Sequence, residues 1–111
     1  SDAMESVFRA LAHDSRRQLL DRLYARRGQT LGELATGLPV SRQAVAKHLA
    51  ILETANLVAT HWRGREKLHY LNPVPIADIV RRWVGKFEET RLAALADFKE
   101  GIENHKEIRH A

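Results

Sequence analysis

Two helix-start signals joined by a short connection constrain this sequence more than any other feature. Thr30 is followed three residues later by Glu33, the pattern of a capping box, and predicts a short helix that ends near Gly37. Pro39 then interrupts the chain, and Ser41 can cap a second helix. The pattern therefore predicts two helices joined by a tight turn.

The second of these helices has two different faces. Val45, Leu49 and Leu52 recur at helical spacing and predict a buried stripe. Val40, before the cap, can form a hydrophobic staple with Val45 that fixes the angle between the two helices. The opposite face is small, polar or basic, and it consists of Arg42, Gln43, Ala46, Lys47 and Ala50.

A change of period after Leu57 predicts a hairpin. Val58, Thr60 and Trp62 alternate along one predicted strand, and Leu68 and Tyr70 along the next. The segment 63–66 is the turn, in which Gly64 can take a positive φ. A helix-turn-helix followed by a basic-tipped hairpin is a winged helix, so the expected fold class is mostly α with a small β-hairpin.

Helices are also expected on both sides of this core. Residues 4–11 and 15–26 have amphipathic periods, with His13-Asp14-Ser15 as a cap and Gly28 as a stop. The second of these helices is expected to point Arg16, Arg17 and Arg22 outward. Helix returns from Ile76, and the step from Phe87 to Leu92 breaks its phase, so it is either one helix with an irregularity near residues 88–90 or two helices.

Three segments follow from this pattern. Residues 1–3 precede Met4 and are interpreted as a remnant of an expression vector. Residues 4–73 form the predicted winged helix-turn-helix core. Residues 74–111 form a predicted C-terminal helical segment, which ends in polar residues.

The basic charge is concentrated in the middle of the chain. Residues 41–70 hold five basic and two acidic side chains, which account for +3 of the net charge of +4. Such a concentration is expected where phosphates are contacted, although a solvated face is the competing interpretation. No cysteine, signal peptide or apolar run of membrane-spanning length is present, so we expect a cytoplasmic protein with no membrane partner.

These features predict a double-stranded DNA interface. A helix fits the major groove, where Gln43 can pair with adenine and Arg42 with guanine or a phosphate. Arg63 and Arg65 flank the hairpin tip and can enter the minor groove. His48 either bonds a phosphate or packs at the edge of the core. The full set of predicted DNA-binding residues is Ser41, Arg42, Gln43, Ala46, Lys47, His48, Arg63, Arg65 and Lys67.

Three stretches together resemble the ArsR/SmtB family of bacterial winged-helix repressors. They are FRALAHDSRRQLLDRL, TLGELATGLPVSRQAVAKHLAILETANLV and RGREKLHYLNP, and the resemblance is clear from Met4 to Pro73. It implies a homodimer that binds an imperfect palindrome and pairs through its first and last helices. The implied interface residues are Val7, Phe8, Leu11, Trp83, Phe87, Leu92 and Leu95.

The sequence departs from the metal-sensing members of that family. The stretch Glu33–Gly37 carries no cysteine, and Asp97 is followed two residues later by Lys99 rather than histidine. We therefore predict a family member that does not sense metal and that has no metal site and no cofactor. A small-molecule inducer of unidentified chemistry remains a candidate partner. A metal-responsive repressor that uses His105, His110 and nearby carboxylates is one alternative, and a winged helix for protein contacts is another.

An enzyme is not expected. The sequence has no glycine-rich phosphate loop, no cysteine nucleophile and no spaced metal triad. The adjacent residues His13-Asp14-Ser15 are triad types, but helix capping explains them better than catalysis does.

Overall fold

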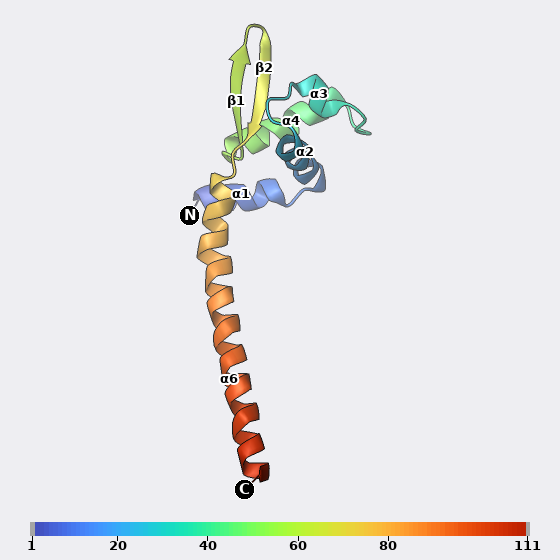
Figure 1. Cartoon of the computed structure of the whole chain (residues 1–111). Coiled ribbons are helices and arrows are strands. Elements are labelled where there is room, and N and C mark those ends of the chain that lie inside the picture. Colours follow the sequence, from blue (N-terminus) through green and yellow to red (C-terminus); the bar gives the residue numbers. More distant parts are fainter. Residues whose placement is uncertain (1, 111) are drawn as a thin grey trace. The chain divides into compact units, whose positions relative to one another are not determined.

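The chain folds into two units, Ser1–Ala77 and Asp78–Ala111. The computed structural model describes the backbone of residues 2–110 and the side chains of residues 2–105. The first unit holds four helices, a two-stranded hairpin and most of a fifth helix (Figure 1). Its elements are α1 (Asp2–Leu11), α2 (Asp14–Ala25), α3 (Leu31–Ala35), α4 (Arg42–Thr54), β1 (Val58–Arg63), β2 (Glu66–Leu71) and α5 (Val74–Ile79).

The core of the first unit is built from the apolar stripes of its helices. The buried leucines of α2, α3 and α4 meet the first apolar residues after α4, and none of these leucines is more than 7% exposed. Each such leucine stabilises the fold by about 1.5–3 kcal/mol relative to an exposed position. The largest fully buried side chains are Leu19, Leu23, Leu34, Val45, Leu52 and Leu57.

All three predicted helix caps are confirmed. Nδ1 of His13 accepts a hydrogen bond from the backbone N–H of Ser15 at the start of α2. Thr30 and Glu33 form the reciprocal capping box of α3. The hydrogen bond from the backbone of Thr30, followed by one from Arg26, lowers the pKa of the Glu33 carboxyl. Ser41 Oγ accepts from the N–H of Ala44 and begins α4.

The sequence predicted that the arginines of α2 point outward into solvent, but their guanidinium groups bind backbone carbonyls of neighbouring helices. Arg22 reaches across to the end of α3, where its Nη1 donates to the carbonyls of Leu34 at 3.1 Å and Thr36 at 2.6 Å. The last carbonyls of a helix have no partner within it, so they attract donors from elsewhere. The guanidinium groups of Arg16 and Arg17 turn back in the same way to the end of α1.

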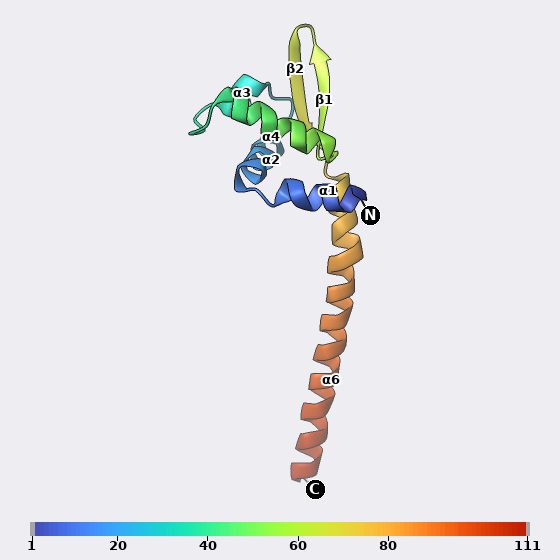
Figure 2. The same ribbon diagram turned by 180° about the vertical axis from the view of Figure 1, so that it is seen from behind.

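The hairpin has the predicted turn and slightly longer strands. β1 and β2 pair antiparallel with Arg63 opposite Glu66, and Gly64 takes a φ of +61° in the turn. Figures 1 and 2 show the hairpin projecting away from the helices of the first unit. An additional bridge between Gln29 and His69 adds the α2–α3 connection to the edge of β2.

The last part of the chain differs from the sequence prediction in two places. Helix α5 begins at Val74, not at Ile76, because a proline fits the first turn of a helix and Asn72 Oδ1 accepts from the N–H of Val74. The irregularity is not at residues 88–90: it is a π-helical segment, Val80–Val84, and α6 (Gly85–His110) follows. The wider π turn shifts helical phase there, upstream of the predicted position.

The helix of the second unit exposes large apolar side chains. Every side chain described in α6 is exposed, including Phe87 at 66%. No helix within the described residues is both long enough and apolar enough to span a membrane.

One of the predicted interface residues on α1 is buried within its own chain. Val7 is only 4% exposed and lies in the core, whereas Phe8 is 42% exposed. Val7 is therefore not available to a partner.

The contacts of Arg22 predict a specific loss of stability. Arg22→Met keeps much of the length of the side chain but leaves the carbonyls of Leu34 and Thr36 without this donor. We expect the free energy of unfolding to fall by about 1–3 kcal/mol, the usual effect of unsatisfying such groups. Urea denaturation measures it.

Arg27→Met is the matched control, because Arg27 is exposed and its side chain forms no hydrogen bond or ion pair with any of the described residues. Equal losses in the two variants would show that the Arg22 contacts do not stabilise α3.

Candidate nucleic-acid interface

The recognition face is the exposed side of α4. Its buried side carries Val45, Leu49 and Leu52, as the helical period predicted. The side chains of Arg42, Gln43, Ala46, Lys47 and Ala50 are all exposed. No acidic residue lies in the first turn, so nothing offsets the partial positive charge of the helix N-terminus there. This face combines donors, small side chains and positive potential.

A groove separates this face from the hairpin. It has a volume of about 380 Å³ and is open to solvent. Arg42 and Ala46 line it from α4, whereas Arg65 and Lys67 line it from the hairpin. The fold thus brings together residues that lie about twenty positions apart in the sequence.

The basic side chains around the groove are not equally free. Lys67 Nζ lies 3.2 Å from a carboxylate oxygen of Glu53, and Arg63 lies 3.6 Å from Glu66. Among the described residues, no ion pair involves Arg42, Lys47 or Arg65. These last three cations can meet a phosphate without first leaving another partner.

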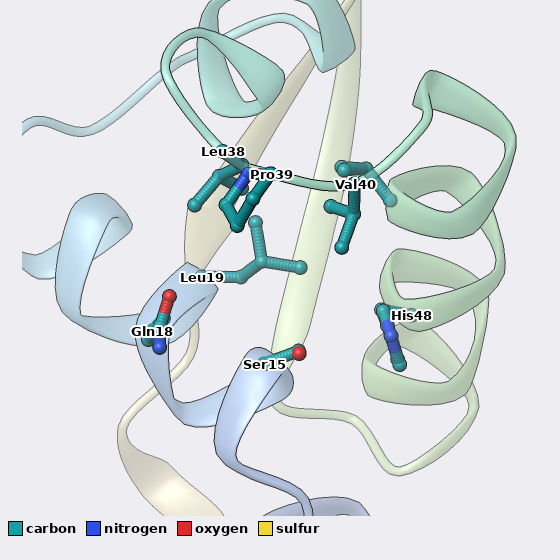
Figure 3. A pocket seen from close by; sticks show the side chains of 8 residues that line it. Ser15, Gln18, Leu19, Leu38, Pro39, Val40 and His48 are labelled. Atoms are coloured by element: carbon teal, nitrogen blue, oxygen red, sulfur yellow. The ribbon is translucent and has the colours of Figure 1, made fainter.

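His48 does not lie on this face. Its ring stacks obliquely on that of His13, with 4.8 Å between centroids, and its Nδ1 lies 3.4 Å from Nη1 of Arg16. Figure 3 shows its side chain on α4 facing the cavity toward α2. The structure therefore favours the alternative of a histidine packed at the edge of the core, and His48 is removed from the DNA-binding set.

His69 and Gln29 attach the hairpin to the end of α2. Both are buried, although histidine and glutamine are polar. Nδ1 of His69 lies 2.9 Å from the carbonyl oxygen of Gln29, and the Gln29 amide donates to the carbonyls of Arg22 and Arg26 at 2.8 Å and 2.7 Å. This network joins β2 to the end of α2. Sequence reasoning missed Gln29, because a lone glutamine after a glycine carries no recognisable pattern.

Comparison with known proteins identifies a helix-turn-helix domain, in agreement with the observed fold. Residues 11–61 match the family described as a helix-turn-helix domain. The transcriptional regulator Rv2034 of Mycobacterium tuberculosis is 40% identical over 83 residues, which cover 71% of this chain and 77% of that protein. The transcriptional repressor SdpR of Bacillus subtilis is 30% identical over 84 residues, which cover 76% of this chain and 91% of that protein.

A solved structure extends the likeness to the fold. The ArsR-like transcriptional regulator from Rhodococcus sp. RHA1 superposes with a TM-score of 0.68 at 37% identity, covering 87% of this chain and 92% of its own. This chain belongs to the ArsR family of winged helix-turn-helix transcriptional regulators. The predicted family and fold class are confirmed, and the function is that of a DNA-binding transcriptional regulator.

This ArsR-family regulator shows no assembled metal site in the part that the structure describes. No three histidine, aspartate or glutamate side chains among those residues come together as potential ligands. His105 lies on α6, and the side chain of His110 lies outside the described residues.

The Glu53–Lys67 pair predicts how the groove responds to a change of charge. Glu53→Gln removes the carboxylate that holds Lys67, so the lysine becomes available to phosphate. We expect affinity for any duplex to rise by about twofold to fivefold at low salt, the scale of a partly exposed ion pair. Fluorescence polarisation measures it.

Glu66→Gln is the matched control, since Glu66 faces Arg63 at the longer distance of 3.6 Å at the exposed tip. The smaller rise is expected there. Unchanged affinity in the Glu53 variant would show that Lys67 contributes no phosphate contact.

Proposed function

We propose that this ArsR-family regulator is a cytoplasmic homodimeric repressor that binds a palindromic operator. Helix α4 enters the major groove, and the hairpin reaches the adjacent minor groove. The observation that carries the proposal is the groove between them, which places free cations of α4 and of the hairpin on one surface. The likeness to the repressor SdpR supports repression as the outcome.

The proposed roles on α4 follow from side-chain chemistry. Gln43 is exposed in the first turn and can donate to and accept from adenine in one plane. Arg42 can bind guanine or a phosphate. Ala46 permits close approach and can meet a thymine methyl. Ser41, at the helix N-terminus, and Lys47 are assigned to phosphate.

The proposed roles on the hairpin separate tip from stem. Arg65 forms no ion pair with any of the described residues, and with Arg63 it can enter a narrow minor groove, where the negative potential is strongest. Lys67 lies in the stem, where its pair with Glu53 holds it at the side of the groove. These contacts depend on the shape of the duplex more than on its base sequence.

Two substitutions distinguish base reading from general attraction. Arg63→Ala should weaken all DNA similarly, because its contact is to backbone and groove shape. Gln43→Ala should change base preference, with a loss of about 1–3 kcal/mol for the correct base. Fluorescence polarisation against the DNA upstream of this regulator's own gene and a scrambled duplex measures both. Unchanged selectivity in the Gln43 variant would rule out Gln43 as a reader.

A salt series separates DNA binding from use of the winged helix for protein contact. Neutralised phosphates release counterions, so the logarithm of affinity should fall steeply and linearly with the logarithm of salt concentration. Tight binding to the upstream duplex alone would indicate autoregulation. No binding to either duplex at low salt would contradict the proposed function.

Dimerisation is proposed from the apolar surface that the single chain leaves uncovered. Phe8 and Leu11 are the remaining candidates on α1 after the burial of Val7, and the second unit contributes Trp83, Phe87, Leu92 and Leu95. Side chains of this size gain about 1.5–3 kcal/mol each when they leave water. A palindromic operator also requires two copies of the recognition helix related by a twofold axis. The segment 74–111 is proposed as the dimerisation segment on these grounds.

A pair of substitutions on α6 tests the proposed interface. Leu95→Glu places a carboxylate on the apolar face, whereas Ala93→Glu places the same charge on the opposite face of the helix. We expect the first to raise the dimer dissociation constant by roughly tenfold to a hundredfold and to weaken operator binding, and the second to change little. Sedimentation equilibrium measures the dissociation constant. Equal effects would argue against this face as the interface.

A further inference from the structure

Three side chains join the recognition helix to α1 and α2. His13 caps the start of α2, Arg16 belongs to the first turns of α2, and His48 belongs to α4. Arg16 is the link, since its Nε donates to the carbonyl of Ala10 at 2.8 Å and its Nη2 to that of Arg9 at 2.9 Å. Its Nη1 lies 3.4 Å from Nδ1 of His48. One guanidinium group thus holds the end of α1 and the middle of α4.

The chemistry of these contacts requires both imidazole rings to be neutral. An arginine has only donors, so the contact between Arg16 and His48 needs a lone pair on Nδ1 of His48. Nδ1 of His13 likewise accepts the N–H of Ser15 at 3.3 Å. An imidazolium ring carries a proton on both nitrogens and cannot accept. Protonation of either ring therefore converts a hydrogen bond into a repulsive contact.

The surroundings of the two rings reinforce this effect. His48 is half-buried beside a cavity of about 80 Å³, which Figure 3 shows with Leu38, Pro39 and Val40 on one side and Ser15, Gln18 and Leu19 on the other. All of these lining residues are uncharged. The charged groups that face His48 are Arg16 and, when protonated, His13. A charge at His13 would also oppose the positive end of the α2 dipole.

The acidic residue that follows His13 in the sequence is engaged elsewhere. The carboxylate of Asp14 accepts from the Gln18 amide at 2.8 Å and lies 3.5 Å from Arg17. Burial, followed by the charges of His13 and Arg16, lowers the pKa of His48 from its ordinary value of 6.5. No acidic group within the described residues contributes to that shift.

We propose that His13, Arg16 and His48 form a proton-sensitive latch, which holds the recognition helix against α1 and α2 at neutral pH and releases it on mild acidification. The latch itself is a property of the folded chain. Its consequence, the loss of operator binding at low pH, rests on the proposed function.

The direction of the effect follows from linkage. The unfolded chain takes up the proton of His48 near pH 6.5, whereas the folded chain resists it to a lower pH. The stability that this group contributes is therefore complete above pH 6.5, falls as the pH drops from 6.5 toward the folded pKa, and is absent below it. This trend is opposite to that of a histidine held by a carboxylate.

The first test uses the protein without DNA. The double variant His13→Asn/His48→Gln replaces each ring by a side chain that accepts the same kind of hydrogen bond and does not titrate, since asparagine also caps helices well. The wild-type melting temperature should fall between about pH 7.5 and pH 5.5, the range in which histidine titrates, and should fall distinctly less in the variant. His61→Gln, at an exposed position of β1, should keep the wild-type dependence.

A measurement on the unaltered protein guards against a variant that fails to fold. Hydrogen exchange should show protection factors for the first turns of α2 and the middle of α4 that decrease toward pH 5.5 more than those of the β1–β2 pair. The latch is overturned if the wild type and the double variant share one pH dependence. It is also overturned if protection in α4 and in the hairpin decreases equally.

The second test concerns the operator and separates the two proposals. With the duplex from upstream of this regulator's own gene, wild-type affinity should drop several-fold between about pH 7.5 and pH 5.5, whereas the affinity of the double variant should drop distinctly less. Absence of binding at every pH would contradict the proposed function and leave the stability result to decide on the latch. Binding that strengthens equally in both proteins on acidification would show that the latch does not regulate DNA.

Discussion

The fold depends on how the ends of its short helices are satisfied. The last carbonyls of α1 and α3 have no partners inside their own helices, and in a unit this small they cannot all be covered by further secondary structure. Helix α2 supplies the missing donors. Arg16 and Arg17 bind the end of α1, and Arg22 binds the end of α3. One central helix therefore carries the polar contacts that position its neighbours.

The same helix also positions both parts of the candidate DNA interface. Arg16 continues from the end of α1 to His48 on α4, so the recognition helix is attached at its inner edge. At the other end of α2, the Gln29 amide binds the last carbonyls, and its backbone carbonyl lies against His69 of β2. Contacts at the two ends of α2 thus hold both α4 and the hairpin, which form the two sides of the groove.

Basic residues consequently divide into two kinds with different roles. The arginines of α2 are committed to carbonyl groups within the chain, so little of their charge is offered to a ligand. Arg42, Lys47 and Arg65 form no ion pair in the described part of the chain, and Arg42 and Arg65 line the groove. Net charge alone does not separate these groups, because a guanidinium group counts as +1 in either setting. The local concentration of charge in residues 41–70 was informative because no arginine of that segment binds a backbone carbonyl of the described residues, as those of α2 do.

The sequence by itself determined the caps, the helical faces and the hairpin turn. Ser41, the Thr30–Glu33 box and Gly64 act over a few residues, so their patterns are complete in the local sequence. The exposed face of α4 was readable for the same reason, because burial of Val45, Leu49 and Leu52 dictates which residues face outward. The position of the π-helical segment was not predicted, because the backbone widens upstream of the break in the apolar pattern.

Tertiary structure alone decided which polar side chains are bound inside the molecule. His48 could have met a phosphate or the core, and only the approach of α2 placed it beside His13 and Arg16. Val7 could have faced a partner, and the packing of α1 buried it. Gln29 and His69 meet across forty positions. Such contacts depend on distances between helices, which the one-dimensional spacing of residues does not contain.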